Sequence, residues 1–389
     1  MSTFRFTDEQ SAIRDAIQKL CDQFGDDYWL KLDQSGEFPN DFVNAIARDG
    51  WLGISMPEKF GGAGLGITEA CVMLQTVTES GAGFSGASAI HLNIFGLNPV
   101  VVFGSEAQQA RMLPPLIRGD ERACFGVTEP NAGLDTTSLQ TMAVRDGDSY
   151  VVNGRKMWTS CAQSADKILL LARTAAKDAS PKKTDGISLF YTDFDREHIE
   201  AREIEKMGRK AVDSNAVFID GLRIPQEDRI GDEGKGFSYI LHGLNPERIM
   251  IAAEAVGLGR AALRRAVNYA KERVVFGRPI GANQGIQHPL AKCWAELEAA
   301  NLMAFHAAAL YDAGEACGGE ANAAKYLAAE ACFHACETAV MTHGGMGYAK
   351  EFHVERYMRE SLIARIAPVS REMILNFIGE KILELPRSF

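Results

Sequence analysis

The spacing of apolar residues changes twice along this chain of 389 residues. In residues 1–120 they recur three and four apart between Gly-rich turns, which predicts helices. Residues 121–231 break into short apolar or alternating segments, and long Ala-rich segments of helical spacing follow in 232–389. The chain is too long for one hydrophobic core. We therefore predict an α+β protein with an N-terminal helical domain (1–120), a middle antiparallel β-barrel or sandwich domain (121–231) and a C-terminal four-helix bundle (232–389).

The middle region is punctuated by Asp-Gly and Asn-Gly pairs, which favour tight hairpin turns. We expect strands at 123–128, 141–145, 150–153, 167–172, 186–191 and 216–219.

The segment 244–248 (LNPER) opens a strongly patterned helix. Pro246 fits the first turn of a helix or kinks a longer one, and the sequence leaves both open. Glu247 stands at an apolar entrance, where a carboxylate is costly unless it pairs with Arg248 or takes part in proton transfer. The residues that follow form one apolar stripe of small and branched side chains, typical of a buried bundle helix. The stripe comprises Ala252, Val256, Gly259, Leu263, Val267 and Ala270.

Composition excludes several classes of function. The net charge of −10 without a Lys/Arg stripe argues against nucleic-acid binding. No apolar run approaches the roughly 20 residues of a membrane helix, so no membrane insertion is expected, and the absence of an import signal predicts a cytoplasmic protein. The eight cysteines lack a CxxC pair and are expected to be reduced. Cys332 and Cys336 are expected to pack in a helix, and no metal site is predicted.

The Gly-rich segment 61–66 (GGAGLG) resembles a phosphate-binding loop only superficially. No β-branched strand precedes it, and its glycines do not have the GxGxxG spacing. We interpret it as a helix connector whose glycines adopt positive φ.

Five motifs together resemble the acyl-CoA dehydrogenases, in register over nearly the whole chain. They are 125–133 (FGVTEPNAG), 154–160 (GRKMWTS), 207–209 (MGR), 272–278 (ERVVFGR) and 343–348 (HGGMGY). Several motifs at the right separations are far more specific than one alone. The resemblance implies FAD as cofactor, in a crevice between the β domain and the C-terminal bundle.

By similarity, one set of residues lines the isoalloxazine ring of FAD. A flat, electron-poor ring is suited by an aromatic neighbour and a few fixed donors. Trp158 would pack on the ring and Ser160 would donate a hydrogen bond near N5. Contacts from backbone and hydroxyl groups would come from Phe125, Val127 and Thr128.

A second set resembles the family's contacts to the ADP end of FAD, with Arg273 placed for the pyrophosphate. These residues would hold a flavin seated on another subunit, so the resemblance implies a homo-oligomer, with a tetramer of paired dimers as the family habit. The set comprises Arg273, Phe276, Gln284, Met341, Gly344 and Gly345.

The resemblance also implies which residue is the catalytic base, because the late loop near residue 367 lacks the usual glutamate. Most relatives carry a glutamate there, where this chain has Ala367. A minority, including isovaleryl-CoA and long-chain acyl-CoA dehydrogenases, carry it at the position of Glu247. The resemblance implies that Glu247 removes the α-proton of an acyl-CoA, flavin N5 takes the β-hydrogen as hydride, and the N–H of Ala367 polarises the thioester carbonyl. Substrate contacts would also come from Asn245, Arg248 and Leu134.

Four residues depart from the family pattern. Leu134 replaces a serine that contacts cofactor or pantetheine, and Met341 replaces a glutamine before the Gly-Gly turn. Val369 and Arg371 replace polar partners of the ADP end. We expect them to alter FAD affinity and CoA orientation.

Three functions remain open from the sequence. The first is an acyl-CoA dehydrogenase that forms the 2-enoyl-CoA and passes electrons to an electron-transfer flavoprotein. The second is a related flavoenzyme, such as an acyl-CoA oxidase or an enzyme that eliminates a substituent. The third is a non-catalytic acyl-CoA-binding protein, in which Glu247 has only a structural role.

Overall fold

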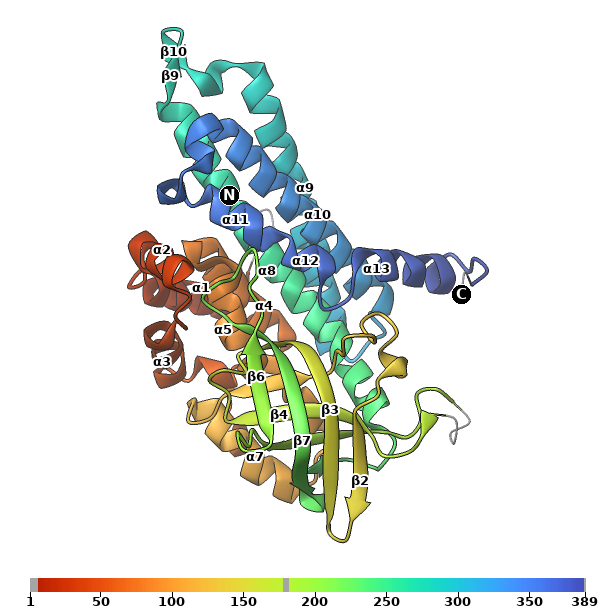
Figure 1. Cartoon of the computed structure of the whole chain (residues 1–389). Helices are drawn as coiled ribbons and strands as arrows, with labels where there is room; N and C mark the ends of the chain where they lie inside the picture. The colour runs from red at the N-terminus through yellow and green to blue at the C-terminus, as the bar shows by residue number, and fades with distance from the viewer. Residues whose placement is uncertain (1–5, 178–181, 388–389) are drawn as a thin grey trace.

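The predicted order of helical, β and helical regions is confirmed in the computed structural model, which describes residues 6–177 and 182–387 (Figure 1). The N-terminal helices lie against one side of the long central helix α8 (Gly236–Glu272), and the sheet lies beside them. The remaining C-terminal helices pack along α8 and extend beyond the other two regions. α8 therefore links the three parts of the molecule.

The described part of the N-terminal region, from residue 6 on, contains seven α-helices, and the first shows why the sequence pattern predicts them. Thr7 caps α1 in a capping box with Gln10, and Ile13, Ile17 and Leu20 are buried, as the spacing indicates. The segment 61–66 is a connector, with φ of +94° at Gly61 and +64° at Gly64. The helices are α1 (Asp8–Cys21), α2 (Asp26–Ser35), α3 (Asn40–Arg48), α4 (Ile67–Val77), α5 (Gly83–Phe95), α6 (Asn98–Phe103) and α7 (Glu106–Arg118).

The stretch Ile67–Phe103 differs from the expectation that no segment is long and apolar enough to cross a membrane. An 18-residue window in it has a mean hydropathy of 1.4, but 61% of that window is buried inside the protein. The stretch is also broken by a π-helical turn at Thr78–Ala82, where Gly81 has φ of +115°. Packing in the protein core accounts for its apolar character.

The described residues of the middle region, 121–177 and 182–231, form an eight-stranded sheet in the order β6-β7-β3-β2-β4-β5-β8, with β1 beside β4. The prediction of an antiparallel sheet needs one correction, because β1–β4 and β2–β4 pair in parallel. The sequence pattern also missed β6 and β8, which are too short or too polar to show an apolar period. The strands are β1 (Ala123–Gly126), β2 (Met142–Asp146), β3 (Ser149–Ser160), β4 (Lys167–Arg173), β5 (Ile187–Asp193), β6 (Ile199–Glu203), β7 (Ser214–Pro225) and β8 (Arg229–Ile230).

The C-terminal region is built around α8, which runs for 37 residues and places Pro246 inside the helix rather than in its first turn. Two glycines on α8 permit close packing. A Cβ on Gly257 would overlap Thr78 Oγ1 of the π turn, and a Cβ on Gly259 would lie 2.5 Å from Leu297 Cδ2 of α9. The other helices are α9 (Gln284–Asp312), α10 (Gly318–His343), α11 (Val354–Ser361), α12 (Ile363–Ile366) and α13 (Arg371–Phe377), and a small hairpin pairs β9 (Val274–Val275) with β10 (Arg278–Pro279).

The fourth member of the bundle is not one continuous helix. Short helices α11, α12 and α13 occupy its place: α11 begins after His353, which adopts a left-handed conformation, and α12 ends where Ala367 precedes Pro368 in extended backbone. The break after α12 creates the loop 367–370 beside α8.

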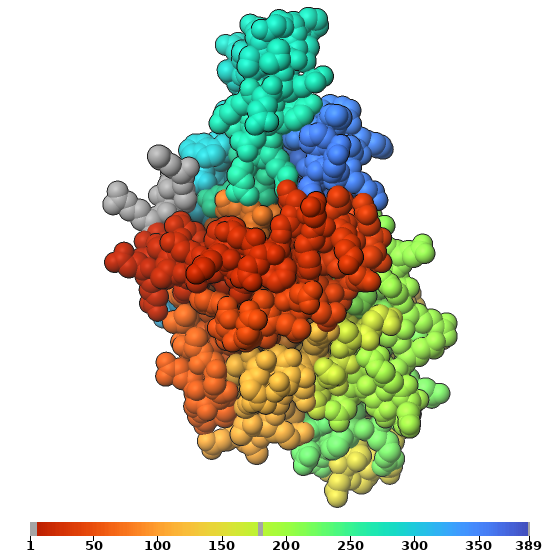
Figure 2. All heavy atoms as spheres, turned by 90° about the vertical axis from the view of Figure 1, so that its left-hand side faces the viewer, coloured from red at the N-terminus to blue at the C-terminus, as the bar shows by residue number. Residues whose placement is uncertain are grey.

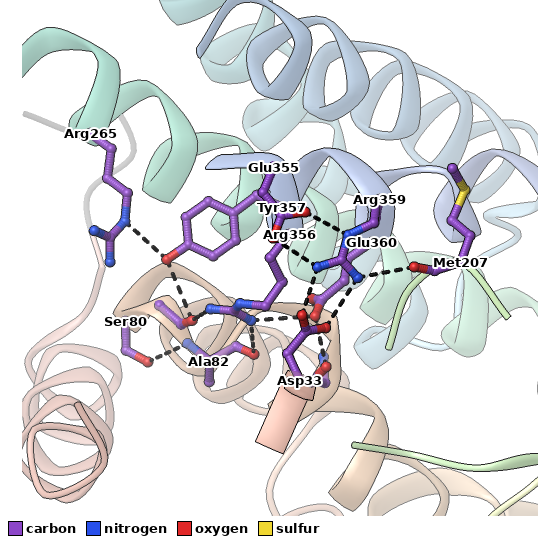
Figure 3. Close-up of polar contacts among 12 residues, drawn as sticks. Asp33, Ser80, Ala82, Met207, Arg265, Glu355, Arg356, Tyr357, Arg359 and Glu360 are labelled. Atoms are coloured by element: carbon purple, nitrogen blue, oxygen red, sulfur yellow. Dashed lines mark hydrogen bonds and ion pairs between the residues drawn. The ribbon is translucent and has the colours of Figure 1, made fainter. Parts of the chain in front are cut away.

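Arg356 of α11 links the C-terminal region to the N-terminal region (Figure 3). The break between α4 and α5 leaves backbone carbonyls without helical partners. The Arg356 guanidinium donates to Gly81 O at 2.6 Å and to Ala82 O at 3.4 Å, and it pairs with Glu360 at 3.3 Å. All of this lies out of contact with water, since Arg356 and Glu360 are each 1% exposed.

One turn further along α11, Arg359 joins three regions. It forms two hydrogen bonds with Asp33 of α2, pairs with Glu355 at 2.7 Å, and donates to Met207 O of the β region at 3.0 Å (Figure 3). These contacts fix the three regions around the cavity described next.

Candidate active site

A cavity of about 460 Å³ lies where the sheet, α5, α8 and the loop after α12 meet. Its size is within the range of small-molecule sites. Most of its walls are apolar, and a few ionisable groups face it. The lining includes His91, Leu92, Phe95, Phe125, Val127, Thr128, Leu134, Trp158, Ile240, Leu244, Glu247, Arg248 and Ala367.

Trp158 presents its ring at the sheet side of this cavity. The register of β3 against β7 shifts between Lys156 and Thr159, so a bulge turns the chain there. Trp158 has φ of +61°, which is strained for a bulky residue, and it is 56% exposed. A strained aromatic side chain left uncovered beside a cavity is suited to packing on a flat ligand.

A buried ion pair holds the adjacent wall. Lys156 Nζ donates to Glu129 Oε1 at 2.9 Å and to Val127 O at 3.2 Å, while Met157 N donates to Thr128 O at 2.8 Å. The Glu129 carboxylate also accepts hydrogen bonds from the backbone and hydroxyl of Thr141. Burial raises the pKa of Glu129, but Lys156 and these donors outweigh it and lower the pKa below its usual value. Val127 and Thr128 are thus fixed against β3.

The roles of Lys156 and Glu129 were not foreseen from the sequence, although both fall within the quoted motifs. A lysine in a strand reads as solvent-facing unless its burial is known, and here Lys156 is fully buried.

Glu247 lines the cavity from α8, one residue after Pro246. Its carboxylate has no hydrogen bond or ion pair within the described residues. Arg248 instead donates to Asn245 Oδ1 at 2.9 Å, so the pairing of Glu247 with Arg248, one of the two alternatives that the sequence leaves open, does not form. Burial raises the pKa of Glu247, and the positive charges of His91 and Arg248 oppose that rise only in part. A partly buried, unpaired carboxylate of raised pKa is what a general base requires.

The late loop does not present the predicted donor. Ala367 lines the cavity, but its N–H donates to Ile363 O at 2.9 Å because α12 completes its last turn there. The next residue, Pro368, has no N–H. The loop is held by Lys325 of α10, which donates to Val369 O at 2.6 Å.

Of the other residues predicted to contact cofactor or substrate, some line the cavity and some do not. Leu134 lines it and is 66% exposed, whereas Ser160 and Asn245 are not among the lining residues. Arg371 lies outside it and pairs with Glu330 and Glu372 of its own chain.

The second predicted set lies at the far end of the bundle, around the β9–β10 hairpin and the end of α10. The hairpin is at the top of Figure 1, and Figure 2 shows this teal end standing clear of the red N-terminal region. Phe276 is fully exposed and Met341 is 74% exposed, while Gly344 and Gly345 have open space around them. Arg273 and Gln284 are also exposed. One chain therefore does not bring this set to the cavity.

Comparison with known proteins shows to which family this chain belongs. Residues 7–120, 124–222 and 234–383 match the N-terminal, middle and C-terminal domains of acyl-CoA dehydrogenases. The chain belongs to the acyl-CoA dehydrogenase family. Acyl-CoA dehydrogenase FadE12 of Mycobacterium tuberculosis is 36% identical over 402 residues, covering 100% of this chain and 99% of the relative.

Two further relatives are informative. The caffeyl-CoA reductase-Etf complex subunit CarC of Acetobacterium woodii is 35% identical over 340 residues, covering 86% of this chain and 88% of CarC. The structure of butyryl-CoA dehydrogenase from Megasphaera elsdenii superposes with a TM-score of 0.93 at 29% identity, covering 98% and 99% of the two chains. Members of this family are FAD-dependent oxidoreductases that act on acyl-CoA thioesters.

The residues at the cavity fit one end of FAD. The uncovered Trp158 ring and the fixed backbone of Val127 and Thr128 suit a flat ring system, and the open approach to Gly344 and Gly345 suits a cofactor that comes from outside this chain. Within the described ranges no cluster of metal-ligating side chains occurs, and all eight cysteines are buried and free, including Cys332 and Cys336.

Proposed function

We propose that this protein is an acyl-CoA dehydrogenase that converts an acyl-CoA thioester to the 2-enoyl-CoA, with Glu247 as the base. The observation that carries the proposal is the unpaired Glu247 carboxylate facing the same cavity as Trp158. A base on one side of the substrate and a flavin on the other are the two groups that α,β-dehydrogenation needs.

Each residue then has a defined task. Glu247 accepts the α-proton, and burial makes its carboxylate a stronger base than an exposed glutamate. Arg248, held by Asn245, keeps a positive charge beside that carboxylate. The apolar side chains of Phe95, Ile240 and their neighbours exclude water from the reacting carbons. Bound FAD would accept the β-hydrogen as hydride, with Trp158 and the 125–128 backbone holding its ring.

The second set of predicted residues supports a homo-oligomer as part of the proposal. Phe276, Met341 and the 90% exposed Tyr348 are uncovered apolar side chains on the hairpin and at the end of α10. Such uncovered side chains are typical of an interface. A neighbouring subunit seated there would bring its own flavin to Arg273 and Gln284, with dimers pairing into a tetramer.

An electron-transfer flavoprotein is the proposed electron acceptor. The name of CarC places that relative in a complex with such a protein and describes a reductase. The same site could therefore reduce a 2-enoyl-CoA, because a base that removes an α-proton also returns it in the reverse direction.

Anaerobic bleaching of the flavin tests the activity. We expect the purified protein to be yellow and an acyl-CoA of suitable length to reduce the flavin without oxygen. Slow reoxidation in air would fit the flavoprotein acceptor, and fast reoxidation would indicate an oxidase. Release of a substituent from the acyl group would indicate elimination. A protein that binds no flavin, or that no acyl-CoA reduces, would overturn the proposal and favour a non-catalytic role.

Arg273→Ala should purify largely without FAD, because the guanidinium would lose its charge-assisted hydrogen bonds to the pyrophosphate. The measurement is the ratio of flavin to protein absorbance after gel filtration. Lys271→Ala is the matched control, since Lys271 is exposed two residues earlier and should keep full FAD. Full occupancy in Arg273→Ala would contradict the assignment.

A further inference from the structure

A buried histidine–glutamate pair lies at the cavity, and its histidine forms part of the wall. His91 of α5 lines the cavity, and its Nδ1 lies 2.7 Å from Glu254 Oε1 of α8. The two residues are 7% and 1% exposed. Glu254 is seven residues after Glu247 on the same helix, a rise of roughly 10 Å. The imidazole therefore lies within about two helical turns of the proposed base.

The second ring nitrogen of His91 is available to a ligand. Among the described residues no group forms a hydrogen bond with Nε2, and the ring faces the cavity. Burial lowers the pKa of His91, but the Glu254 carboxylate more than compensates, so the pKa is raised overall. The protonated ring would donate Nδ1–H to Glu254 and direct Nε2–H into the cavity.

The other side chains of this wall are apolar and suit a hydrocarbon chain. Leu92, Phe95, Ile240 and Leu244 line the same part of the molecule. A buried ion pair among apolar side chains is no more stabilising than apolar residues of similar size. Its presence at the cavity that would hold the acyl group therefore points to a polar feature of that group.

We infer that His91, held by Glu254, recognises a hydrogen-bond-accepting oxygen on the acyl group, so that the substrate is a functionalised acyl-CoA rather than a plain fatty acyl-CoA. The oxygen is a carboxylate, carbonyl or hydroxyl beyond the carbons that react. The inference rests on the proposed function and names its substrate class.

Matched acyl-CoA pairs test it with the FAD-loaded enzyme. Butanoyl-, hexanoyl- and octanoyl-CoA are compared with their counterparts of equal length that end in a carboxylate, a ketone or a hydroxyl group. The readout is the rate of anaerobic flavin reduction divided by the dissociation constant. For at least one length we expect the oxygen-bearing compound to be preferred by roughly 10- to 100-fold, the value of a hydrogen bond from a charged donor.

Two variants assign the preference to the pair. His91→Leu/Glu254→Leu removes both partners, which avoids leaving a buried charge alone, and should bring the preference close to one. Glu254→Gln keeps a hydrogen bond to Nδ1 but removes the negative charge that favours the protonated ring, and its amide can either donate to Nδ1 or accept from it. The preference for a carboxylate, which depends on the positive charge of the ring, should fall more than the preference for a ketone or a hydroxyl. His198→Leu removes a similar pair with Asp195 outside the cavity and should leave the preference as in the wild type.

The possible results separate the two proposals. Failure of every acyl-CoA to reduce the flavin overturns the proposed function. Reduction by plain acyl-CoAs with no preference for any oxygen-bearing partner overturns only this inference. An equal loss for both members of a pair in the double variant would also overturn it, and would assign His91 to positioning Glu247. Flavin content and thermal unfolding of each variant show that the fold is kept.

Discussion

Replacing Glu247 with glutamine should slow anaerobic flavin reduction by about a thousandfold, within the usual effect of losing a general base. Glutamine has nearly the same shape but cannot accept a proton at neutral pH. Glu247 makes no hydrogen bond or ion pair within the part of the chain that is described, so its loss should leave the fold and the flavin content intact. The measurement is stopped-flow reduction by the best acyl-CoA, with flavin absorbance before mixing as the check on cofactor content.

The pH profile gives a second readout of the same residue. Because burial raises the pKa of Glu247, the wild-type rate should fall as the pH drops through a value above that of an ordinary glutamate. The rate is present above that pKa, where the carboxylate is ionised. Glu247→Asp should retain part of the rate because the base is kept but shortened. An unchanged rate in Glu247→Gln would show that another group takes the proton.

The order of the three regions could be predicted because each has a distinct apolar period over many residues. The 37-residue helix α8 gives a strong helical signal in the sequence. Its apolar stripe passes through Ala252 and Val256, and both of these side chains are fully buried. The two-residue strand β8 gives none. The parallel pairing of β1 with β4 could not be foreseen, because strand direction in a sheet depends on contacts between segments about 40 residues apart.

The residues of the candidate site were likewise predictable only in part. Glu247, Trp158 and Val127 reach one cavity as the family resemblance implies. The pairing of His91 with Glu254 joins positions 163 apart in sequence and depends on how α5 crosses α8. One local signal existed, since Glu254 is the single charged residue in the otherwise apolar run 249–259, where an acid needs a partner.

Arg248 and Ala367 show why a motif does not fix hydrogen bonding. The sequence allowed Arg248 to pair with Glu247, but its guanidinium meets the Asn245 side chain one turn earlier on α8. The N–H of Ala367 was expected to face the thioester, yet the last turn of α12 uses it. The first outcome depends on which side chains share a face of α8, and the second depends on where α12 ends, which local sequence predicts least well.

Arg356→Met should destabilise the protein by roughly 3–5 kcal/mol, the loss typical of breaking a buried ion pair. It would leave the Glu360 carboxylate buried with only its contacts to Ser85, and it would remove the donors to Gly81 O and Ala82 O. Because these contacts join α11 to the π turn between α4 and α5, separate unfolding of the C-terminal region should become easier. The measurement is the free energy of unfolding in guanidinium chloride.

A double-mutant cycle separates the ion pair from its surroundings. Glu360→Gln combined with Arg356→Met should be less destabilising than the sum of the single changes, because no charge then remains buried alone. Arg202→Met is the control, since its pair with Glu200 is exposed and screened by water, and its loss should change the stability little. If Arg356→Met cost no more than Arg202→Met, the contacts in Figure 3 would not be what holds the three regions around the cavity. A large loss of unfolding free energy confined to Arg356→Met would indicate that the shape of the active site depends on this small network, although the network is far from Glu247 in sequence.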